Sequence, residues 1–151
     1  MAMSCSQALE QPRPDTPPGL PVLLVAAICL IDRDGRILIA QRPEGKPMAG
    51  LWEFPGGKVD AGETPEFALC REMEEELDVQ VRECCLTPLG FASHSYEKFH
   101  LMMPLYSCRM WKGTPAPREG QVLKWVRPSE LAAHDMPPAD IPLIHQIIDR
   151  L

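Results

Sequence analysis

Four glutamates crowd the run REMEEE, at Glu72, Glu74, Glu75 and Glu76. Like charges one helical turn apart destabilise a helix by about a few tenths of a kcal/mol per pair, so such a run needs a counter-charge. At about 100° per residue, a helix places Glu72, Glu75 and Glu76 on one face. Carboxylate oxygens are typical ligands of a hard cation such as Mg²⁺ or Mn²⁺. The run therefore predicts a metal site or, alternatively, a solvated acidic face on which Arg71 pairs with Glu75.

A helix must hold these carboxylates, and the sequence marks where it begins. Thr64 suits the N-cap, and Pro65 suits the first helical position, where its missing N–H costs nothing. On this helix Phe67 falls on the apolar side, opposite the three glutamates. Just upstream, FPGGK places Gly56 and Gly57 where the backbone turns sharply or approaches another group closely. A glycine carbonyl there could complete an oxygen shell around the cation.

Strand patterns outnumber helical ones in the rest of the chain. Its 151 residues have the length of one domain, and we expect a disordered proline-rich tail over residues 1–20 and a folded domain over residues 21–151. The first two strands are predicted to form a hairpin, because Asp34-Gly35 is a strong turn signal. Strands that do not alternate with helices indicate an α+β or mixed-sheet α/β class. Strands are predicted at residues 23–31, 36–42, 51–54, 86–96, 99–111 and 121–126, and later helices at 127–131 and 138–151.

Composition and charge exclude several classes of protein. The net charge of −6 argues against a nucleic-acid polymer or an anionic membrane as partner. A small phosphorylated ligand is compatible with this charge if metal ions supply positive charge. None of the six cysteines forms a Cys-x-x-Cys pair, and we interpret them as reduced thiols of a cytoplasmic protein. The apolar run Val22–Ile31 is about half the length of a membrane span and is interpreted as a buried strand.

From Gly57 onward the sequence resembles the Nudix box, whose pattern is G-x5-E-x7-R-E-U-x-E-E-x-G-U, with U an aliphatic residue. Every fixed position matches except the final glycine, which is Asp78 here. The resemblance implies an α/β/α sandwich with a central mixed sheet. It also implies a set of functional residues: metal ligands Glu72, Glu75, Glu76 and the Gly56 carbonyl, with Arg71 orienting the carboxylates and Glu63 holding the loop against the helix.

Beyond the box, residues 22–151 resemble the MutT branch of the family, which comprises 8-oxo-dGTP diphosphatases. The segments AQRP, LWEFPGGKV, WKGTPAPREGQ and PPADIPLI carry this resemblance. It implies that Arg42 contacts substrate phosphates and that Glu119 reaches the metal site from a loop. The other substrate-binding residues it implies are Glu53, Phe54, Pro55, Gly56 and Asp140.

Asp140 is a departure from the MutT pattern, which has a base-reading asparagine at this position. Asparagine donates and accepts hydrogen bonds, whereas an ionised Asp only accepts. A carboxylate suits the adjacent N–H donors of guanine or 8-oxoguanine. Related pyrimidine-nucleotide pyrophosphohydrolases carry a similar Pro-Ala-Asp-Ile-Pro segment. Asp140 is also a candidate N-cap of the last helix, and both roles can hold together because an N-cap side chain can lie at a pocket wall.

The resemblance implies metal-dependent hydrolysis of a nucleoside triphosphate at its β-phosphorus, which gives the monophosphate and pyrophosphate. The expected substrate is 8-oxo-dGTP, and the expected role is sanitation of the nucleotide pool. The alternatives are a CTP or dCTP pyrophosphohydrolase and a non-catalytic nucleotide-sensing module, although such modules typically lose box glutamates that this chain keeps. Either Glu72 or Glu119 is expected to be the general base. We expect a cytoplasmic monomer or weak dimer.

Overall fold

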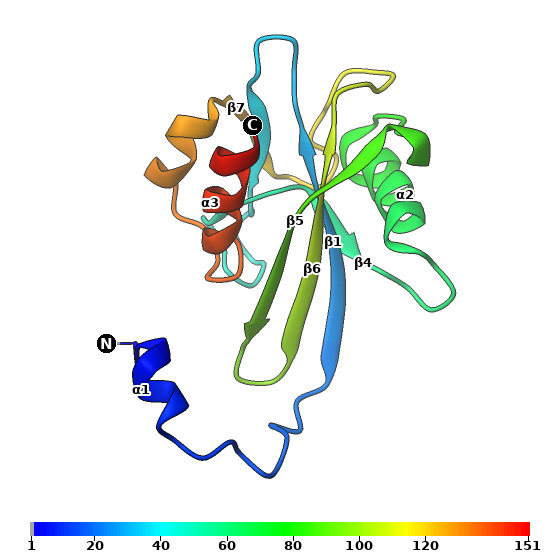
Figure 1. Cartoon of the computed structure of the whole chain (residues 1–151). Helices are drawn as coiled ribbons and strands as arrows, with labels where there is room; N and C mark the ends of the chain where they lie inside the picture. The colour runs from blue at the N-terminus through cyan, green and yellow to red at the C-terminus, as the bar shows by residue number, and fades with distance from the viewer. Residues whose placement is uncertain (1) are drawn as a thin grey trace.

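The computed structural model describes residues 2–151, whose strands form two sheets (Figure 1). The four-stranded sheet has the order β4-β1-β6-β5, and it consists of β1 (Val22–Leu30), β4 (Gly56–Lys58), β5 (Leu86–Ser95) and β6 (His100–Cys108). The three-stranded sheet has the order β3-β2-β7, and it consists of β2 (Ile37–Gln41), β3 (Trp52–Glu53) and β7 (Val122–Val126). Because β1 runs parallel to β6 and antiparallel to β4, the predicted mixed sheet is confirmed.

Two helices cover the long strands from opposite sides. Helices α2 (Pro65–Leu77) and α3 (Ile141–Arg150) lie on either side of β1, β5 and β6 (Figure 1). The remaining helical segments are α1 (Cys5–Leu9) and the 3-10 turns η1 (Glu83–Cys85) and η2 (Pro128–Ala133). This layering is the α/β/α sandwich implied by the resemblance.

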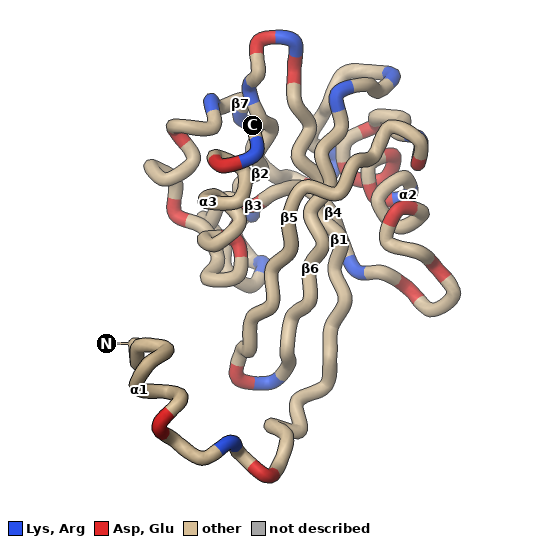
Figure 2. Tube along the Cα trace, in the orientation of Figure 1, with Lys and Arg blue, Asp and Glu red and all other residues tan. Residues whose placement is uncertain are grey.

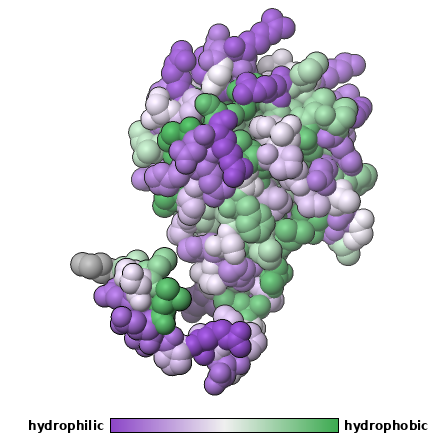
Figure 3. Space-filling model, viewed as in Figure 1, coloured by the Kyte–Doolittle hydropathy of each residue, from purple (hydrophilic) through white to green (hydrophobic). Residues whose placement is uncertain are grey.

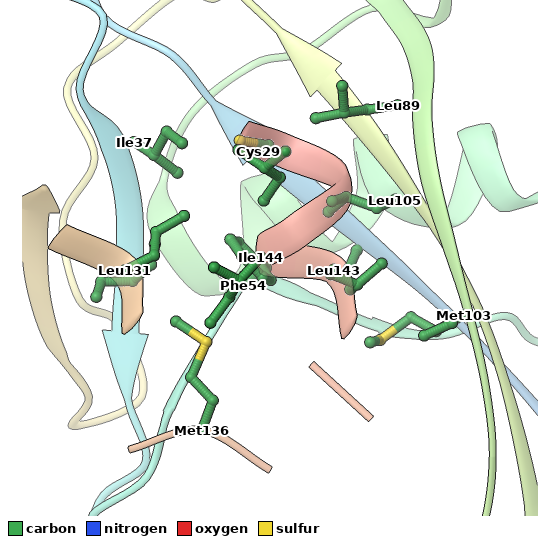
Figure 4. Packing of buried hydrophobic residues seen from close by; sticks show 14 of the residues in the cluster. Cys29, Ile37, Phe54, Leu89, Met103, Leu105, Leu131, Met136, Leu143 and Ile144 are labelled. Carbon is green, nitrogen blue, oxygen red and sulfur yellow. The ribbon is translucent and has the colours of Figure 1, made fainter. Parts of the chain in front are cut away.

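The second half of β1, residues 26–30, is buried on both faces because each helical layer covers one of them. Cys29 belongs to the apolar cluster that includes Leu143 and Ile144 of α3, and Figure 4 shows these side chains close together. Ile28 belongs to a second cluster, which includes Met73 of α2. Successive strand side chains point to opposite faces. The apolar run is therefore continuous rather than alternating, as predicted for a buried strand.

The turn between β1 and β2 forms as predicted, but the expected hairpin does not continue beyond it. Gly35 has a φ of 79°, and the Asp32 carboxylate accepts the backbone N–H groups of Asp34 and Arg36 at 2.9 and 2.8 Å. The two chain segments then pair only at a single bridge, between Ile31 and Ile37. The hairpin prediction is wrong beyond that bridge, because β2 pairs with β3 and β7 in the other sheet.

Helix α2 begins and ends where the sequence predicts, but its buried face differs by one residue. The Thr64 side chain accepts the backbone N–H of Phe67 at 3.1 Å, and Asp78 ends the helix in the left-handed region at φ 58° and ψ 36°. Phe67 is 55% exposed, so its predicted place on the apolar face is wrong. The helix is rotated so that Ala68 meets the sheet instead. The buried residues of α2 are Ala68, Leu69, Met73 and Leu77.

The N-terminal segment lies apart from the sheets (Figure 1), and residues 2–19 are exposed throughout. It contains the short helix α1, whose N-cap Ser4 accepts the backbone N–H of Gln7 at 3.2 Å. Disorder of residues 1–20 remains a prediction. Figure 3 shows apolar surface at the end of the long strands that lies nearest the N-terminal segment. Val22 and Leu24, in the first half of β1, are exposed. Over the described residues, no helix is long and apolar enough to cross a membrane.

Candidate active site

A cleft of about 350 Å³ is lined by residues from both sheets. Arg42 at the end of β2, Glu53 in β3 and Gly56 in β4 reach it from different strands. The predicted site residues in its lining are Arg42, Glu53, Phe54, Pro55, Gly56, Glu76, Glu119 and Asp140. The remaining predicted residues, Arg71, Glu72 and Glu75, lie on α2, along which acidic residues gather (Figure 2).

Arg71 ties the loop before α2 to the carboxylates on that helix. Its Nε and Nη2 each donate to an oxygen of Glu63 at 2.8 Å. Its Nη1 donates to Glu72 at 2.9 Å and to Glu75 at 3.3 Å. Glu63 also accepts the backbone N–H of Asp60 at 2.9 Å. The hydrogen bonds from Arg71 and Asp60 lower the pKa of Glu63 to about 2, so its carboxylate stays charged.

The Glu72 carboxyl lies against the backbone of the glycine loop. A Cβ on Gly57 would overlap this carboxyl group, so a larger residue there would displace the Glu72 side chain. Burial and the negative charges of Glu72, Glu119 and Glu53 raise the pKa of Glu76 above its ordinary value. Neighbouring carboxylates disfavour each other's charged form, and a cation would relieve that cost. The donor atoms gathered here are oxygens, the type that a hard divalent ion prefers.

Gly56 is held at the cleft by its pairing with the central strand. It lies opposite Ala27 of β1, and a Cβ at Gly56 would overlap the Ala26 carbonyl oxygen. The preceding Pro55 accepts the backbone N–H of Ile28 at 2.8 Å. The position of the glycine loop is therefore set by β1 rather than by the loop alone.

The loop that carries Glu119 is fastened to the end of α2. The Glu76 carbonyl accepts the backbone N–H of Arg118 at 3.0 Å and the Gln121 side-chain amide at 3.2 Å. The Gln121 side chain also accepts the backbone N–H of Glu119 at 2.8 Å. These bonds occupy a carbonyl that a helix end leaves free. Gln121 is thus a supporting residue that the sequence analysis missed, although it lies in the segment REGQ.

Glu75 is placed differently from its neighbours. Its side chain is 57% exposed and pairs with Arg71, as the acidic-face alternative predicts. Within residues 2–151, no three His, Cys, Asp or Glu side chains are grouped closely enough to hold a metal ion. The ligand set remains a prediction: Gly56, Glu72, Glu75, Glu76 and Glu119.

Arg42 lines the cleft as a paired cation. Its Nε donates to Glu53 at 2.8 Å, and its Nη1 donates to the Pro47 carbonyl at 2.9 Å. Burial raises the pKa of Glu53, and the positive charge of Arg42 opposes this rise. The cleft therefore contains the Arg42 guanidinium, and the Glu53 carboxylate offsets its positive charge.

Asp140 and two aromatic residues form a separate part of the lining. Asp140 is 5% exposed and holds the N-cap position of α3, as predicted, but its side chain makes no capping hydrogen bond there. The Tyr96 hydroxyl accepts the backbone N–H of Ala139 at 3.3 Å, and the Tyr96 and Phe99 rings lie 5.2 Å apart. Sequence reasoning missed both aromatics; their only signal was their position beside the β5–β6 turn.

Comparisons with known proteins agree with this fold and this box. The profile of the NUDIX domain matches residues 26–146. The chain is 39% identical to an 8-oxo-dGTP diphosphatase of Haemophilus influenzae over 85% of this chain and 93% of the relative. It is 42% identical to a CTP pyrophosphohydrolase of Escherichia coli over 80% of this chain and 87% of the relative.

Solved structures with a similar fold belong to the same family. A structure from a study of MutT from Aliivibrio salmonicida and Vibrio cholerae superposes with a TM-score of 0.73 at 34% identity, over 86% of this chain and 99% of that one. A MutT NUDIX hydrolase from Burkholderia pseudomallei superposes with a TM-score of 0.68 at 30% identity, over 86% and 98%. The chain therefore belongs to the NUDIX domain family and is a Nudix hydrolase.

Proposed function

We propose that this Nudix hydrolase converts a nucleoside triphosphate, foremost 8-oxo-dGTP, to the monophosphate and pyrophosphate. The observation that carries the proposal is the division of the cleft into two parts. The acidic part contains Glu76 and Glu119 of the cleft lining together with Glu72 of α2, and the charges of Glu72 and Glu119 act on Glu76. The base part contains Asp140, Tyr96 and Phe99. Glu53 lies close enough to both Glu76 and Asp140 to act on each electrostatically. The two parts are therefore neighbours, and one nucleotide can span them.

In the acidic part, the protein supplies carboxylates and the means to orient them. Nudix hydrolases in general depend on a divalent metal, and we propose Mg²⁺ or Mn²⁺ here because the donors are all oxygens. The bound ion would neutralise phosphate charge and favour attack by water. Arg71 orients Glu72 at 2.9 Å. Glu72 or Glu119 accepts the proton of the attacking water.

In the base part, the protein supplies a polar reader between apolar walls. Asp140 is buried, and Phe54 and the Tyr96–Phe99 pair line the cleft with it. Aromatic rings provide apolar area on which a flat base can pack. The relatives named 8-oxo-dGTP diphosphatase support an oxidised guanine as the base. The relative named CTP pyrophosphohydrolase supports cytosine as a second candidate, because its identity to this chain is similar.

We further propose that the enzyme acts in the cytoplasm as a monomer or weak dimer. The net charge of −6 supports free nucleotides, rather than a nucleic-acid polymer, as its substrates. All six cysteines are free thiols, which suits a reducing compartment. Hydrolysis of an oxidised nucleotide there would keep it out of DNA synthesis.

The test is a panel of 8-oxo-dGTP, dGTP, dATP, dTTP, dCTP and CTP, assayed with Mg²⁺ for pyrophosphate and monophosphate. The proposal expects pyrophosphate release, with the highest kcat/KM for 8-oxo-dGTP. A higher kcat/KM for CTP or dCTP would favour the pyrimidine alternative. Release of orthophosphate, or no reaction with any nucleotide, would contradict the proposed reaction.

A further inference from the structure

Helix α3 is fastened to the edge strand β5 by the side-chain amide of Gln146. The amide Oε1 accepts the backbone N–H of Phe91 at 2.8 Å, and the amide Nε2 donates to the Phe91 carbonyl at 3.0 Å. β5 is the last strand of its sheet, and Phe91 lies opposite Pro104, which has no N–H to donate. The backbone groups of Phe91 therefore face away from β6. The Gln146 amide binds them as the backbone of a further strand would.

Strand β5 departs from regular geometry at the same place. A bulge between Pro88 and Gly90 leaves Leu89 without a partner on β6, and Arg150 of α3 donates to the Leu89 carbonyl. A Cβ on Gly90 would lie 2.6 Å from the Oε1 of Gln146, so a side chain there would displace the amide. Bulges are over-represented beside active sites, where they re-aim side chains. The bulge, the glycine and the amide together form one fastening, which we call the Gln146 clamp.

The Gln146 clamp sets the position of α3 along β5. The helix advances about 6 Å from Gln146 to Arg150, and the strand residues that these two bind lie about 6.6 Å apart. The later helix residue binds the earlier strand residue, so α3 and β5 run antiparallel, side by side (Figure 1). Followed toward its N-terminus, α3 therefore approaches Tyr96, and Asp140 lies there, about 9 Å before Gln146. A shift of α3 along β5 would move Asp140 relative to Tyr96 by the same distance.

The other contacts of α3 fix this position less sharply. The buried residues of α3 are Leu143, Ile144 and Ile147. Burial of apolar area is non-directional, whereas a hydrogen bond requires its atoms at a set distance and angle. Beside the cleft, the hydrogen bond between Tyr96 and Ala139 spans 3.3 Å and is single. The two-bond Gln146 clamp is therefore the stronger directional constraint on the helix.

We propose that Gln146 is a positioning residue for base recognition: its amide fixes α3 on β5 and thereby fixes the distance between Asp140 and the Tyr96–Phe99 pair. This inference rests on the proposed function, in which the base binds between these groups. Gln146 lies outside the cleft lining, so it acts on the base through the helix that it holds. The box carboxylates lie on α2, so loss of the Gln146 clamp weakens base recognition and leaves the chemical step intact.

The experiment measures kcat and KM for the same panel of nucleotides in wild type and in Gln146→Met, whose side chain has a similar length and makes neither hydrogen bond. The ratio of kcat/KM between the best and the worst nucleotide should fall about two- to tenfold, the factor that one net hydrogen bond is worth. The loss should lie in KM for the best nucleotide, with kcat within about twofold of wild type. His145→Met is the matched control, because His145 is the adjacent, exposed residue of α3 and lies outside the cleft lining; it should keep the wild-type ratio.

Gly90→Ala disrupts the Gln146 clamp from the strand side, because the added methyl group displaces the amide without altering it. It should give the same loss as Gln146→Met, and the double variant should lose no more than either single variant. Asp32→Ala separates the clamp from general destabilisation. Asp32 accepts two backbone N–H groups in the turn after β1, outside the cleft lining, so this variant should lower the midpoint of thermal unfolding and keep the ratio.

Three results would each overturn the inference while nucleotide hydrolysis itself upholds the proposed function. They are an unchanged ratio in both Gln146→Met and Gly90→Ala, losses that multiply in the double variant, and a loss that lies in kcat or appears equally in Asp32→Ala. Hydrolysis of no nucleotide by the wild-type protein would overturn both the inference and the proposed function.

Discussion

The acidic part and the base part of the cleft are built in different ways. In the acidic part, Arg71 bonds to Glu63, Glu72, Glu75 and a backbone carbonyl, all within a short stretch of chain. The base part joins segments far apart in the sequence, and the one hydrogen bond between its tyrosine and the loop before α3 spans 3.3 Å. The box carboxylates are therefore fixed locally and redundantly, and only Glu119 joins them from a distant loop. Base preference depends on tertiary assembly, so it is open to change without loss of the chemistry.

Metal removal should produce the largest loss of activity, and this loss should arise in the acidic part alone. An excess of chelator should abolish hydrolysis of every nucleotide, because the clustered carboxylates repel the phosphates unless a metal ion neutralises them. The fold should survive, since both apolar clusters consist of hydrophobic side chains and include none of the proposed metal ligands. Activity assays paired with circular dichroism test this. Full hydrolysis in chelator, or unfolding on chelation, would contradict a metal-dependent acidic part carried by a metal-independent fold.

Glu76→Gln should lower kcat by about a hundred- to a thousandfold, as loss of a group that acts on the transition state does. Glu74→Gln is the matched control, because Glu74 is an exposed glutamate of the same helix and lies outside the cleft lining. The control should keep nearly full activity. Steady-state kinetics with one nucleotide suffices, and equal losses at the two positions would show that α2 does not present its glutamates as described.

Arg71→Ala should lower activity by about ten- to a hundredfold, the range for partners that orient metal ligands. It should also lower the midpoint of thermal unfolding by about 5 °C, because Glu63 and Glu72 lose their shared cation. Arg36→Ala is the control: Arg36 pairs with Asp32 at 2.8 Å in the turn after β1, its side chain is 43% exposed, and the pair lies outside the cleft lining, so it should contribute little. Calorimetry and kinetics together test this, and similar shifts for both variants would contradict the proposed role of Arg71.

The smallest effect is expected in the base part. Tyr96→Phe removes the acceptor of the Ala139 N–H, a bond worth about 0.5–1.5 kcal/mol, and should raise KM for 8-oxo-dGTP about two- to fivefold at unchanged kcat. Tyr106→Phe is the control, because the Tyr106 hydroxyl donates to Glu66 at 2.7 Å on α2, outside the cleft lining. A fall in kcat for Tyr96→Phe would show that the two parts of the cleft are not separable.

The sequence predicts the acidic part of the cleft better than it predicts the base part. The box residues lie within one loop and one helix, so local signals such as the Thr64 cap and Pro65 at the first helical position were predicted and are confirmed. The rotation of α2 that exposes Phe67 was not predictable, because the sheet decides which face is buried. The divergence of β1 and β2 was missed for a similar reason: the pairing of β2 with β7 is a long-range choice.

The base part was the least predictable region. Asp140 was identified by resemblance, but its burial and the absence of a capping bond depend on how α3 packs. Tyr96 and Phe99 carry no motif; they reach the cleft because the β5–β6 turn lies beside the loop before α3. Residues brought together by tertiary packing leave no spacing signal in the sequence.

The most direct test of the division between chemistry and base reading is the ratio of kcat/KM for 8-oxo-dGTP to that for dCTP at pH 8, in wild type, Glu76→Gln and Asp140→Ala. Glu76→Gln should slow both substrates by a similar factor and leave the ratio within about twofold. Asp140→Ala should lower kcat/KM for 8-oxo-dGTP by about ten- to a hundredfold, because hydrogen bonds to a charged group are worth about 1.5–3 kcal/mol, and should lower that for dCTP much less. A Glu76→Gln ratio that shifts as far as the Asp140→Ala ratio would contradict the account.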